Sequence, residues 1–244
     1  MGSKTKEEAM RNLIRTENPD IMLVQETKME ESDFLQSSKK FWKKGGTKAI
    51  SARGASGGLG TMWNTSKLQL IAENHNTHWL LTKFQHLDTK EIFTLFNVYA
   101  PVNAREKKPC WDSLRDMADK EELENIIVAG DLNITLSQGE KRGGSIVRDP
   151  AREWVEDLIQ DWDLLDIKPS RGKYTWSNKR VGPGYIAARL DRFLIQSSYL
   201  LLGLNAKMNI LSNSTSDHKP IKLLLSAQKD LGPIPFRFSP LWIN

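Results

Sequence analysis

One short stretch decides the fold: residues 126–133, which read IIVAGDLN. Its first four residues are apolar and three of them are β-branched, which favours a buried strand. The strand runs directly into Gly130-Asp131-Leu132-Asn133, where small and polar residues begin. Because rigid scaffolds place functional side chains where strands end, this stretch predicts a buried strand with a candidate site at its end.

The sequence on either side alternates between helix-like and strand-like segments. Helices are predicted over residues 5–17, 105–120 and 149–162, and strands over residues 21–24, 79–86, 92–99, 190–195 and 221–225. Residues 45–60 are rich in Gly and Ser and predict loops around short strands. This alternation predicts one mixed α/β domain over residues 1–228, followed by a Pro-rich tail or linker over residues 229–244.

Composition limits the class of protein. The 244 residues include 35 Lys and Arg, 30 Asp and Glu and one Cys, with a formal net charge of +5. A single Cys excludes an intrachain disulfide framework and a Cys-rich zinc site, and the mild positive charge permits a polyanionic partner. The N-terminal residues lack an apolar core, and no apolar run is long enough to span a bilayer. We therefore expect a monomeric nuclear or cytoplasmic protein that is neither secreted nor bound to a membrane.

Five polar motifs lie beside predicted strands. In chain order they are Gln25-Glu26-Thr27, Asn97-Val98-Tyr99-Ala100-Pro101, Gly130-Asp131-Leu132-Asn133, Arg189-Leu190-Asp191-Arg192 and Ser216-Asp217-His218. Any one of them alone is better explained as turn residues, because Asp and Asn favour turns. If the five motifs serve one site, their side chains converge in one cleft, whereas turn residues have no reason to do so.

With these motifs in order, the sequence resembles the endonuclease/exonuclease/phosphatase superfamily. Within it, the chain resembles the apurinic-endonuclease-like domain of LINE-type non-LTR retrotransposons, especially those of plants. Residues 174–178 (YTWSN) followed by residues 189–194 (RLDRFL) are typical of that group, as is Pro235-Phe236-Arg237-Phe238 in the tail. The resemblance implies a four-layer α/β sandwich, in which two packed mixed β-sheets are flanked by helices.

The resemblance also implies an activity: divalent-metal-dependent hydrolysis of DNA phosphodiester bonds, with Mg²⁺ as cofactor and Mn²⁺ as the alternative ion. The catalytic residues that it implies are Tyr99, Asp131, Asn133, Asp191 and His218. Glu26 and Asp217 match metal ligands, since Mg²⁺ prefers oxygen ligands. Thr175 and Ser216 match residues near the DNA backbone phosphates. Basic residues in loops near these motifs add further candidate DNA contacts: Arg53, Lys173, Lys179 and Arg180.

The sequence departs from the family pattern in two places. Relatives begin with a strand of the type Trp-Asn-x-Arg-Gly, whose Asn helps to hold the site, and Gly2-Ser3-Lys4 matches the residues just after it. We therefore expect the first strand and its Asn to be missing. Many relatives also have Asn directly after Tyr-x-Pro, where this chain has Val102 and then Asn103.

The expected loss of the first strand leaves two alternatives open. One is a catalytically impaired remnant that binds nucleic acid or protein. The other is a phosphoesterase that acts on a small substrate, because the superfamily hosts both activities.

Overall fold

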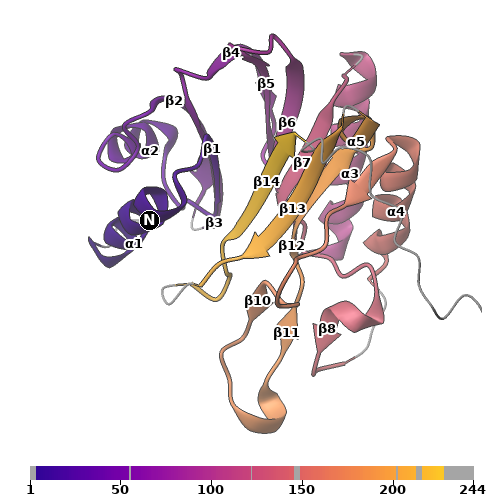
Figure 1. The fold of residues 1–244 in the computed structure, drawn as a ribbon. Helices are drawn as coiled ribbons and strands as arrows, with labels where there is room; N and C mark the ends of the chain where they lie inside the picture. The colour runs from indigo at the N-terminus through magenta and orange to yellow at the C-terminus, as the bar shows by residue number, and fades with distance from the viewer. Residues whose placement is uncertain are drawn as a thin grey trace, which may run out of the picture.

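The computed structural model describes residues 4–54, 56–121, 123–145, 149–201, 203–212 and 216–227. These residues form an α/β sandwich, in which a six-stranded mixed sheet packs against a layer of antiparallel strands and helices cover the outer sides (Figure 1). The expected α/β class and sandwich architecture are confirmed. The second layer differs in one respect, since its described strands form two antiparallel sheets instead of one mixed sheet.

The six-stranded sheet has the order β4-β5-β6-β7-β12-β9. Its strands are β4 (Leu68–His75), β5 (Trp79–His86), β6 (Ile92–Tyr99), β7 (Ile126–Asp131), β12 (Asp191–Gln196) and β9 (Leu164–Asp166). β6 and β7 are parallel, and the other neighbouring strands are antiparallel. The register pairs Tyr99 with Asp131 and Asp131 with Asp191, so three strands bring polar residues to one end of the sheet.

β7 is the buried strand that the sequence predicts, and all six of its residues are buried in the interior of the six-stranded sheet. Within it, Gly130 has a φ of 134°. A Cβ at this position would lie 2.1 Å from the backbone oxygen of Val98 on β6. Only glycine combines this backbone conformation with so close an approach. Gly130 therefore lets β7 pack tightly against β6 one residue before Asp131.

The second layer contains the sheet β1 (Ile21–Gln25), β3 (Ser56–Asn64) and β2 (Gly45–Arg53), in that order, and the pair β13 (Leu204–Ile210) and β14 (Ile221–Ala227). The prediction of loops over residues 45–60 is wrong, because most of this stretch lies in β2 and β3. Its glycines allow close packing: a Cβ on Gly46 would lie 2.0 Å from the Trp63 ring, and one on Gly60 would lie 2.3 Å from the Phe34 ring. Glycine here marks strands packed against aromatic rings.

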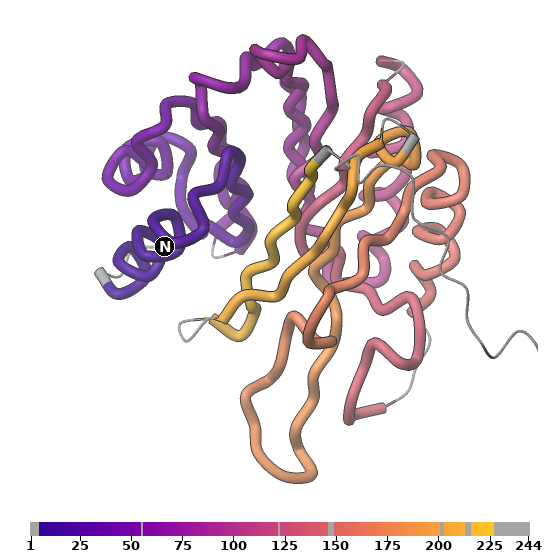
Figure 2. Tube along the Cα trace, in the orientation of Figure 1, coloured from indigo at the N-terminus to yellow at the C-terminus, as the bar shows by residue number. Residues whose placement is uncertain are grey.

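A third, small sheet lies below the sandwich in Figure 1 and consists of β10 (Trp176–Ser177), β11 (Ala187–Ala188) and β8 (Lys141–Arg142). The chain between β10 and β11 includes the short 3₁₀ helix η2 (Gly182–Gly184). Figure 2 shows that this chain segment extends away from the two large layers. A second short helix, η1 (Gln138–Glu140), precedes β8.

The helices are α1 (Lys4–Glu17), α2 (Glu31–Ser38), α3 (Ala104–Lys120), α4 (Ala151–Asp161) and α5 (Ser198–Leu201). α3 and α4 cover the outer face of the six-stranded sheet, where Trp111, Leu114 and Leu158 join its core. α1 and α2 pack outside β1, β2 and β3, through residues such as Met10 and Phe34. A third apolar cluster fills the space between the two layers.

None of the described helices combines the length and the apolar character that a membrane span requires.

Most of the predicted elements are confirmed. The three predicted helices correspond to α1, α3 and α4, and the predicted strands correspond to β1, β5, β6, β7, β12 and β14. At the start of α4, the Asp149 carboxylate accepts a hydrogen bond from the Ala151 amide at 2.9 Å, as its position before Pro150 suggests. The predicted tail over residues 229–244 lies outside the described residues, so the domain boundary stays a prediction.

Candidate functional site

Polar side chains from several elements meet where β6 and β7 end and β12 begins. Tyr99 ends β6, Asp131 ends β7 and Asp191 begins β12. His218, in the segment before β14, forms a β-bridge with Trp176, and its ring reaches Asp191. These residues come from distant parts of the chain, and their side chains converge. A single site requires this convergence, whereas unrelated turn residues would have no reason to lie together.

His218 lies between two carboxylates. Its Nδ1 is 3.0 Å from Asp191 Oδ2, and its Nε2 is 3.7 Å from Asp131 Oδ2. Burial alone would lower the pKa of His218, but the hydrogen bond to Asp191 and the charges of Asp191, Asp131 and Asp217 raise this pKa to about 9. The imidazole therefore carries a proton at neutral pH, with Nδ1 directed at Asp191.

Asp131 is buried and carries an unusual proton affinity. Burial and the neighbouring Asp191 carboxylate raise the pKa of Asp131 to about 7, although His218 opposes this shift. Asn133, with a φ of 48°, folds back over it: its backbone N–H donates to Asp131 Oδ1 at 3.0 Å, and its amide donates to Asp131 Oδ2 at 3.2 Å and to the Ala100 oxygen at 2.8 Å. A carboxyl group held in place that titrates near neutral pH can accept or donate a proton.

Glu26 and Tyr99 form the next part of the site. Glu26 follows β1 with a φ of 50°, and its carboxylate accepts a hydrogen bond from the Tyr99 hydroxyl. Burial, this bond and the charges of Glu26, Asp131 and Asp217 raise the pKa of Tyr99 above its usual range, so the phenol stays protonated. Tyr99 thus lies within the electrostatic reach of three carboxylates that come from three different elements.

Asp217 is exposed, but its carboxylate has defined partners. Its Oδ2 accepts a hydrogen bond from Trp176 Nε1 at 2.9 Å, and its Oδ1 lies 3.4 Å from the Ser216 hydroxyl. Partial burial would raise the pKa of Asp217, but the hydrogen bond from Trp176 and the charge of His218 lower it. Asp217 is therefore a carboxylate at neutral pH.

Two groups of side chains could hold a cation. Asp131, Asp191 and His218 have ligand atoms within 4.8 Å of one another, but Asp191 already holds His218 Nδ1 at 3.0 Å and Asn133 donates to both oxygens of Asp131. Glu26 and Asp217 are exposed carboxylates, and the charge of each raises the pKa of the Tyr99 hydroxyl. They fit a Mg²⁺ ion better, because that ion binds few protein carboxylates and keeps several waters.

The residues predicted to contact nucleic acid differ in exposure. Those at the surface, fully or in part, are Arg53, Lys173, Lys179, Arg180 and Ser216. Arg53 ends β2, whereas Lys179 and Arg180 lie in the segment between β10 and β11 that extends from the sandwich (Figure 2). Ser216 lies beside the site, where its hydroxyl accepts a hydrogen bond from the His218 amide at 3.2 Å.

Thr175 lies in the interior, unlike the other residues of that set. It is fully buried, and its hydroxyl oxygen accepts hydrogen bonds from the backbone N–H groups of Leu190 and Asp191, both at 3.0 Å. A side chain in this position supports Asp191 from below. It does not reach the surface on which a DNA phosphate would lie.

Sequence reasoning missed a buried charge cluster beneath the site. Arg189 and Arg192 are 2% and 0% exposed. Nη1 of Arg189 lies 2.9 Å from Glu140 Oε1 and 2.8 Å from Asp166 Oδ2, and Nη1 of Arg192 lies 3.0 Å and 2.8 Å from the same two atoms. Both arginines belong to the sequence motif around Asp191, but the sequence interpretation assigned neither of them a role. Glu140 and Asp166 lie in no motif of the sequence, and no local pattern pointed to them.

A buried lysine on α3 supports the turn that carries Asn133. Lys107 is 4% exposed. Its ammonium group donates a hydrogen bond to the backbone carbonyl oxygen of Asn133 at 2.9 Å and forms an ion pair with Asp149 at the start of α4. It thereby connects two helices with the turn that carries Asn133. The sequence signal was weak, since Lys107 is one of many charged residues in a polar helix.

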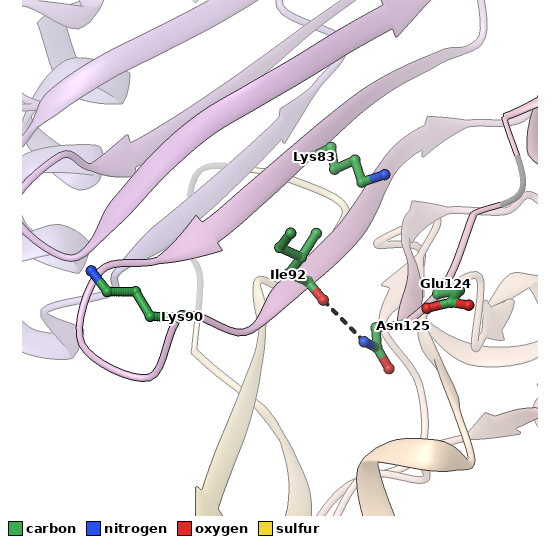
Figure 3. A pocket seen from close by; sticks show the side chains of 5 residues that line it. All are labelled: Lys83, Lys90, Ile92, Glu124 and Asn125. Carbon is green, nitrogen blue, oxygen red and sulfur yellow. Dashed lines mark hydrogen bonds between the residues drawn. The ribbon is translucent and has the colours of Figure 1, made fainter.

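Two hollows in the described surface lie away from these residues. One, of about 290 Å³, is lined by Lys83, Lys90, Ile92, Glu124 and Asn125 (Figure 3). It lies at the start of β6, whereas Tyr99 ends that strand. The other, of about 370 Å³, lies beside α3 and α4. No predicted site residue lines either hollow, so the candidate site is a group at strand ends outside both.

Solved structures share this fold. The AP endonuclease LMAP from Leishmania major is 18% identical, with a TM-score of 0.71, and the match covers 90% of this chain and 82% of that chain. The endonuclease domain of TRAS1, a telomere-specific non-LTR retrotransposon, is 15% identical, with a TM-score of 0.64 and coverage of 93% and 95%. At these identities the likeness shows the fold alone.

Two sequence comparisons add to the fold. The "Transposon TX1 uncharacterized 149 kDa protein" of Xenopus laevis is 28% identical over 153 residues. The match covers 60% of this chain and 12% of that relative, so the chain spans a small part of the relative's length. The model of the Endonuclease/Exonuclease/phosphatase family matches residues 2–218, which is most of the chain. The chain therefore belongs to the endonuclease/exonuclease/phosphatase family.

Proposed function

We propose that the chain is a divalent-metal-dependent endonuclease that hydrolyses DNA phosphodiester bonds and derives from a plant LINE-type non-LTR retrotransposon. The observation that carries the proposal is the pairing of His218 with Asp191 beside the buried Asp131. Phosphodiester hydrolysis requires a proton acceptor for water and hydrogen-bond donors for the charge that develops on the phosphate. The Asp131 carboxylate is the proposed proton acceptor, and the protonated imidazole of His218, whose Nε2 lies 3.7 Å from Asp131 Oδ2, is the proposed donor.

In this scheme the two groups have different tasks. Asp131 takes the proton of the attacking water, since its pKa lies near neutral pH. As the new bond to phosphorus forms, the bond from phosphorus to the leaving oxygen breaks, and a solvent water protonates that oxygen. His218 stays protonated, Asp191 orients its ring through Nδ1, and Nε2 donates to a phosphate oxygen as charge develops. The amide of Asn133 holds Asp131 in place, and the Tyr99 hydroxyl is a further donor near the phosphate.

Glu26 and Asp217 are the proposed ligands for Mg²⁺, with Mn²⁺ as the alternative ion. Both are exposed, and both act on Tyr99, which supports a shared position at the same edge of the site. When bound, such an ion would polarise a phosphate oxygen and offset negative charge in the transition state.

DNA is the proposed substrate. Basic side chains at the surface supply contacts to the phosphate backbone in this proposal, and Lys179 and Arg180 extend from the sandwich between β10 and β11 (Figure 2). Ser216, Arg53 and Lys173 complete the proposed contacts. The names of the similar proteins, which include a transposon protein and two endonucleases, support the same substrate class.

Plasmid nicking tests the proposal. The assay uses the form of the chain that nicks DNA, with or without the N-terminal segment described below. For that form the proposal predicts conversion of supercoiled plasmid to nicked circles with Mg²⁺, none with EDTA, and a loss of about 10²–10⁴-fold in His218→Ala, the usual worth of an acid–base group. His75→Ala is the matched control, because His75 is exposed on β4 and is not one of the site residues. Nicking that survives EDTA, or that His218→Ala leaves unchanged, would exclude this mechanism.

One observation favours a second candidate, a catalytically impaired remnant. Among the described strands, β1 pairs only with β3 and β14 pairs only with β13. Ile21 on β1 and Leu223 on β14 pack onto the same core, and Lys222 Nζ lies 3.0 Å from Glu17 Oε2 just before β1. The two unpaired edges therefore lie over one core, and exposed edges carry backbone groups that need partners. We propose that the family's first strand, with its Asn, belongs between them.

Extension of the chain separates the two candidates. We expect weak or absent nicking by the chain as given, and recovery when a segment of the type Trp-Asn-x-Arg-Gly-Leu precedes Gly2. A lost hydrogen bond to a charged group costs about 1.5–3 kcal/mol, so recovery should be about ten- to hundredfold. An extension with Ala in place of its Asn completes the sheet without the amide and serves as the control. Equally strong nicking with and without the segment excludes the remnant.

A further inference from the structure

The short strand β10 joins parts of the site that lie far apart in the sequence. On one side it pairs with β11, and on the other Trp176 forms a bridge with His218. The backbone N–H of Lys219 donates to the backbone carbonyl oxygen of Thr175 at 2.7 Å, and the backbone N–H of Ser177 donates to that of Asp217 at 3.1 Å. The backbone of β10 therefore fixes the segment that carries Asp217 and His218.

The side chain of Trp176 adds a contact that the backbone pairing does not need. Its Nε1 donates to Asp217 Oδ2 at 2.9 Å. The indole N–H is a donor and both carboxylate oxygens are acceptors, so this contact holds one oxygen of Asp217 against a ring that the pairing of β10 keeps in place. The other oxygen, Oδ1, lies 3.4 Å from the Ser216 hydroxyl, which is a weaker contact. Because Asp217 is exposed while Trp176 is half-buried, the better-packed ring fixes the freer carboxylate.

We propose that Trp176 is a positioning residue, whose indole N–H orients the Asp217 carboxylate for binding of a divalent cation. The inference rests on the proposed function, because Asp217 has its role as a metal ligand only there. Carboxylates that bind metals are themselves hydrogen-bonded by outer partners, and loss of such a partner typically lowers metal affinity by about 10–100-fold. A ring that served only to pack β10 would have no effect on cation binding.

Binding of Mn²⁺ to the chain, measured by titration calorimetry, tests the inference without depending on activity. Trp176→Phe keeps the ring and removes the N–H, so we expect Mn²⁺ affinity to fall by about tenfold or more. Trp42→Phe is the matched control. It also removes an indole hydrogen bond, 3.1 Å to the Trp63 oxygen, but in the core beneath α1 and α2. Trp42→Phe should bind Mn²⁺ as the parent does, although it loses at least as much thermal stability.

A second measurement needs no variant. In the parent chain, saturating Mg²⁺ should shift the indole N–H resonance of Trp176 in NMR spectra and leave that of Trp42 in place. An unmoved Trp176 resonance, a parent chain that binds no Mn²⁺, or equal Mn²⁺ affinity of parent and Trp176→Phe overturns the inference.

These results are distinguishable from failure of the proposed function. If Trp176→Phe weakens Mn²⁺ binding but neither the parent nor its extended form nicks DNA, the inference stands and the endonuclease proposal fails. If the parent nicks DNA and Trp176→Phe binds Mn²⁺ and nicks equally well, the endonuclease proposal stands and the inference is overturned. Where nicking is measurable, raising the Mg²⁺ concentration should restore the rate of Trp176→Phe, which loss of folding would not allow.

Discussion

Two groups of charged side chains meet at β12 and the residues just before it, yet they balance charge differently. The first, the paired cluster, consists of Glu140, Asp166, Arg189 and Arg192, with two carboxylates facing two guanidinium groups. Burial would raise the pKa values of Glu140 and Asp166, but hydrogen bonds from the arginines hold both below their usual range. Its charges are therefore compensated inside the protein.

The second group, the open cluster, consists of Glu26, Asp131, Asp191, Asp217 and His218. Four carboxylates face one imidazole, and two of the carboxylates are exposed. Here burial and the Asp191 charge raise the pKa of Asp131. Burial would lower the pKa of His218, but the hydrogen bond to Asp191 and the neighbouring carboxylates raise it. Groups whose proton affinity is perturbed in this way are frequent at functional sites.

The contrast shows how one segment serves both purposes. Arg189 and Arg192 turn into the paired cluster, whereas Asp191, between them, joins the open cluster. Arg192 also donates to the Ile134 oxygen at 3.2 Å, one residue after Asn133. The paired cluster thus fixes the backbone on both sides of the open cluster, which can then hold unbalanced charge in one geometry.

The largest expected effect comes from removing the charge of Asp191. Asp191→Asn keeps the shape of the side chain but weakens its hold on His218, so nicking should fall by about 10²–10⁴-fold. The circular dichroism spectrum should stay close to that of the parent, and the unfolding free energy should fall by no more than about 1–2 kcal/mol, the amount linked to the His218 proton. The assay uses whichever form, as given or extended, nicks DNA.

Asp88→Asn, in an exposed turn, is the control for the charge change and should nick as the parent does. A near-parental rate for Asp191→Asn would mean that the pair with His218 is structural, and the open cluster would then resemble the paired one.

Breaking the paired cluster should act on stability first. Arg192→Met leaves Glu140 buried without its main partner, and an unpaired buried charge costs about 3–5 kcal/mol of unfolding free energy. Urea unfolding measures this loss. Lys168→Met is the control, because Lys168 contacts the same two carboxylates but its side chain is 61% exposed, so its loss should cost less than about 1 kcal/mol. Equal losses for both variants would contradict the distinction between buried and exposed partners.

Thr175 sharpens the comparison, because it supports Asp191 without any charge. Thr175→Val leaves the backbone N–H groups of Leu190 and Asp191 without their acceptor, at a cost of about 1–3 kcal/mol in unfolding free energy. Thr175→Ser keeps the hydroxyl and should recover most of that loss. If Val and Ser variants unfold alike, the hydroxyl is not the supporting group.

The fold was predictable where burial leaves a local pattern. The apolar run over residues 126–129 predicted β7 because a strand buried on both faces needs apolar residues throughout. The prediction of loops around short strands over residues 45–60 was wrong for the opposite reason, because the long strands β2 and β3 leave no such local pattern. Their glycines fit beneath the rings of Trp63 and Phe34, and a contact of this kind leaves no periodicity in the sequence.

The candidate site was predictable to a similar degree. Asp131, Asp191 and His218 lie in motifs beside strands, and the structure brings them together, while their catalytic roles stay predictions. Glu140 and Asp166 were not predictable, because their arginine partners are 49 to 52 and 23 to 26 residues away and nothing local marks the pairing. Long-range charge pairs of this kind become visible only in the folded structure.

The smallest expected effect is the dependence of stability on pH, and the two clusters give it opposite signs. The pKa of His218 is raised from 6.5 to about 9, so the stability it contributes is complete below pH 6.5 and is lost as the pH rises toward 9. The pKa values of Glu140 and Asp166 are lowered. Their contribution is present above their unfolded values, near pH 4, and is lost as the pH falls through the folded values.

Unfolding free energies between pH 7 and pH 9.5, measured in EDTA, isolate the contribution of His218. The paired carboxylates are ionised throughout this range, because their pKa values are lowered. Asp131, with a pKa of about 7, completes its ionisation near pH 8, so the decrease above that pH belongs to His218. Since the His218 side chain is 31% exposed, we expect the parent to lose about 1–2 kcal/mol more than His218→Ala across the range. His75→Ala should follow the parent. A His218→Ala profile parallel to that of the parent would mean that Asp191 does not hold a charged imidazole, because the stability linked to that proton must disappear with the ring that binds it.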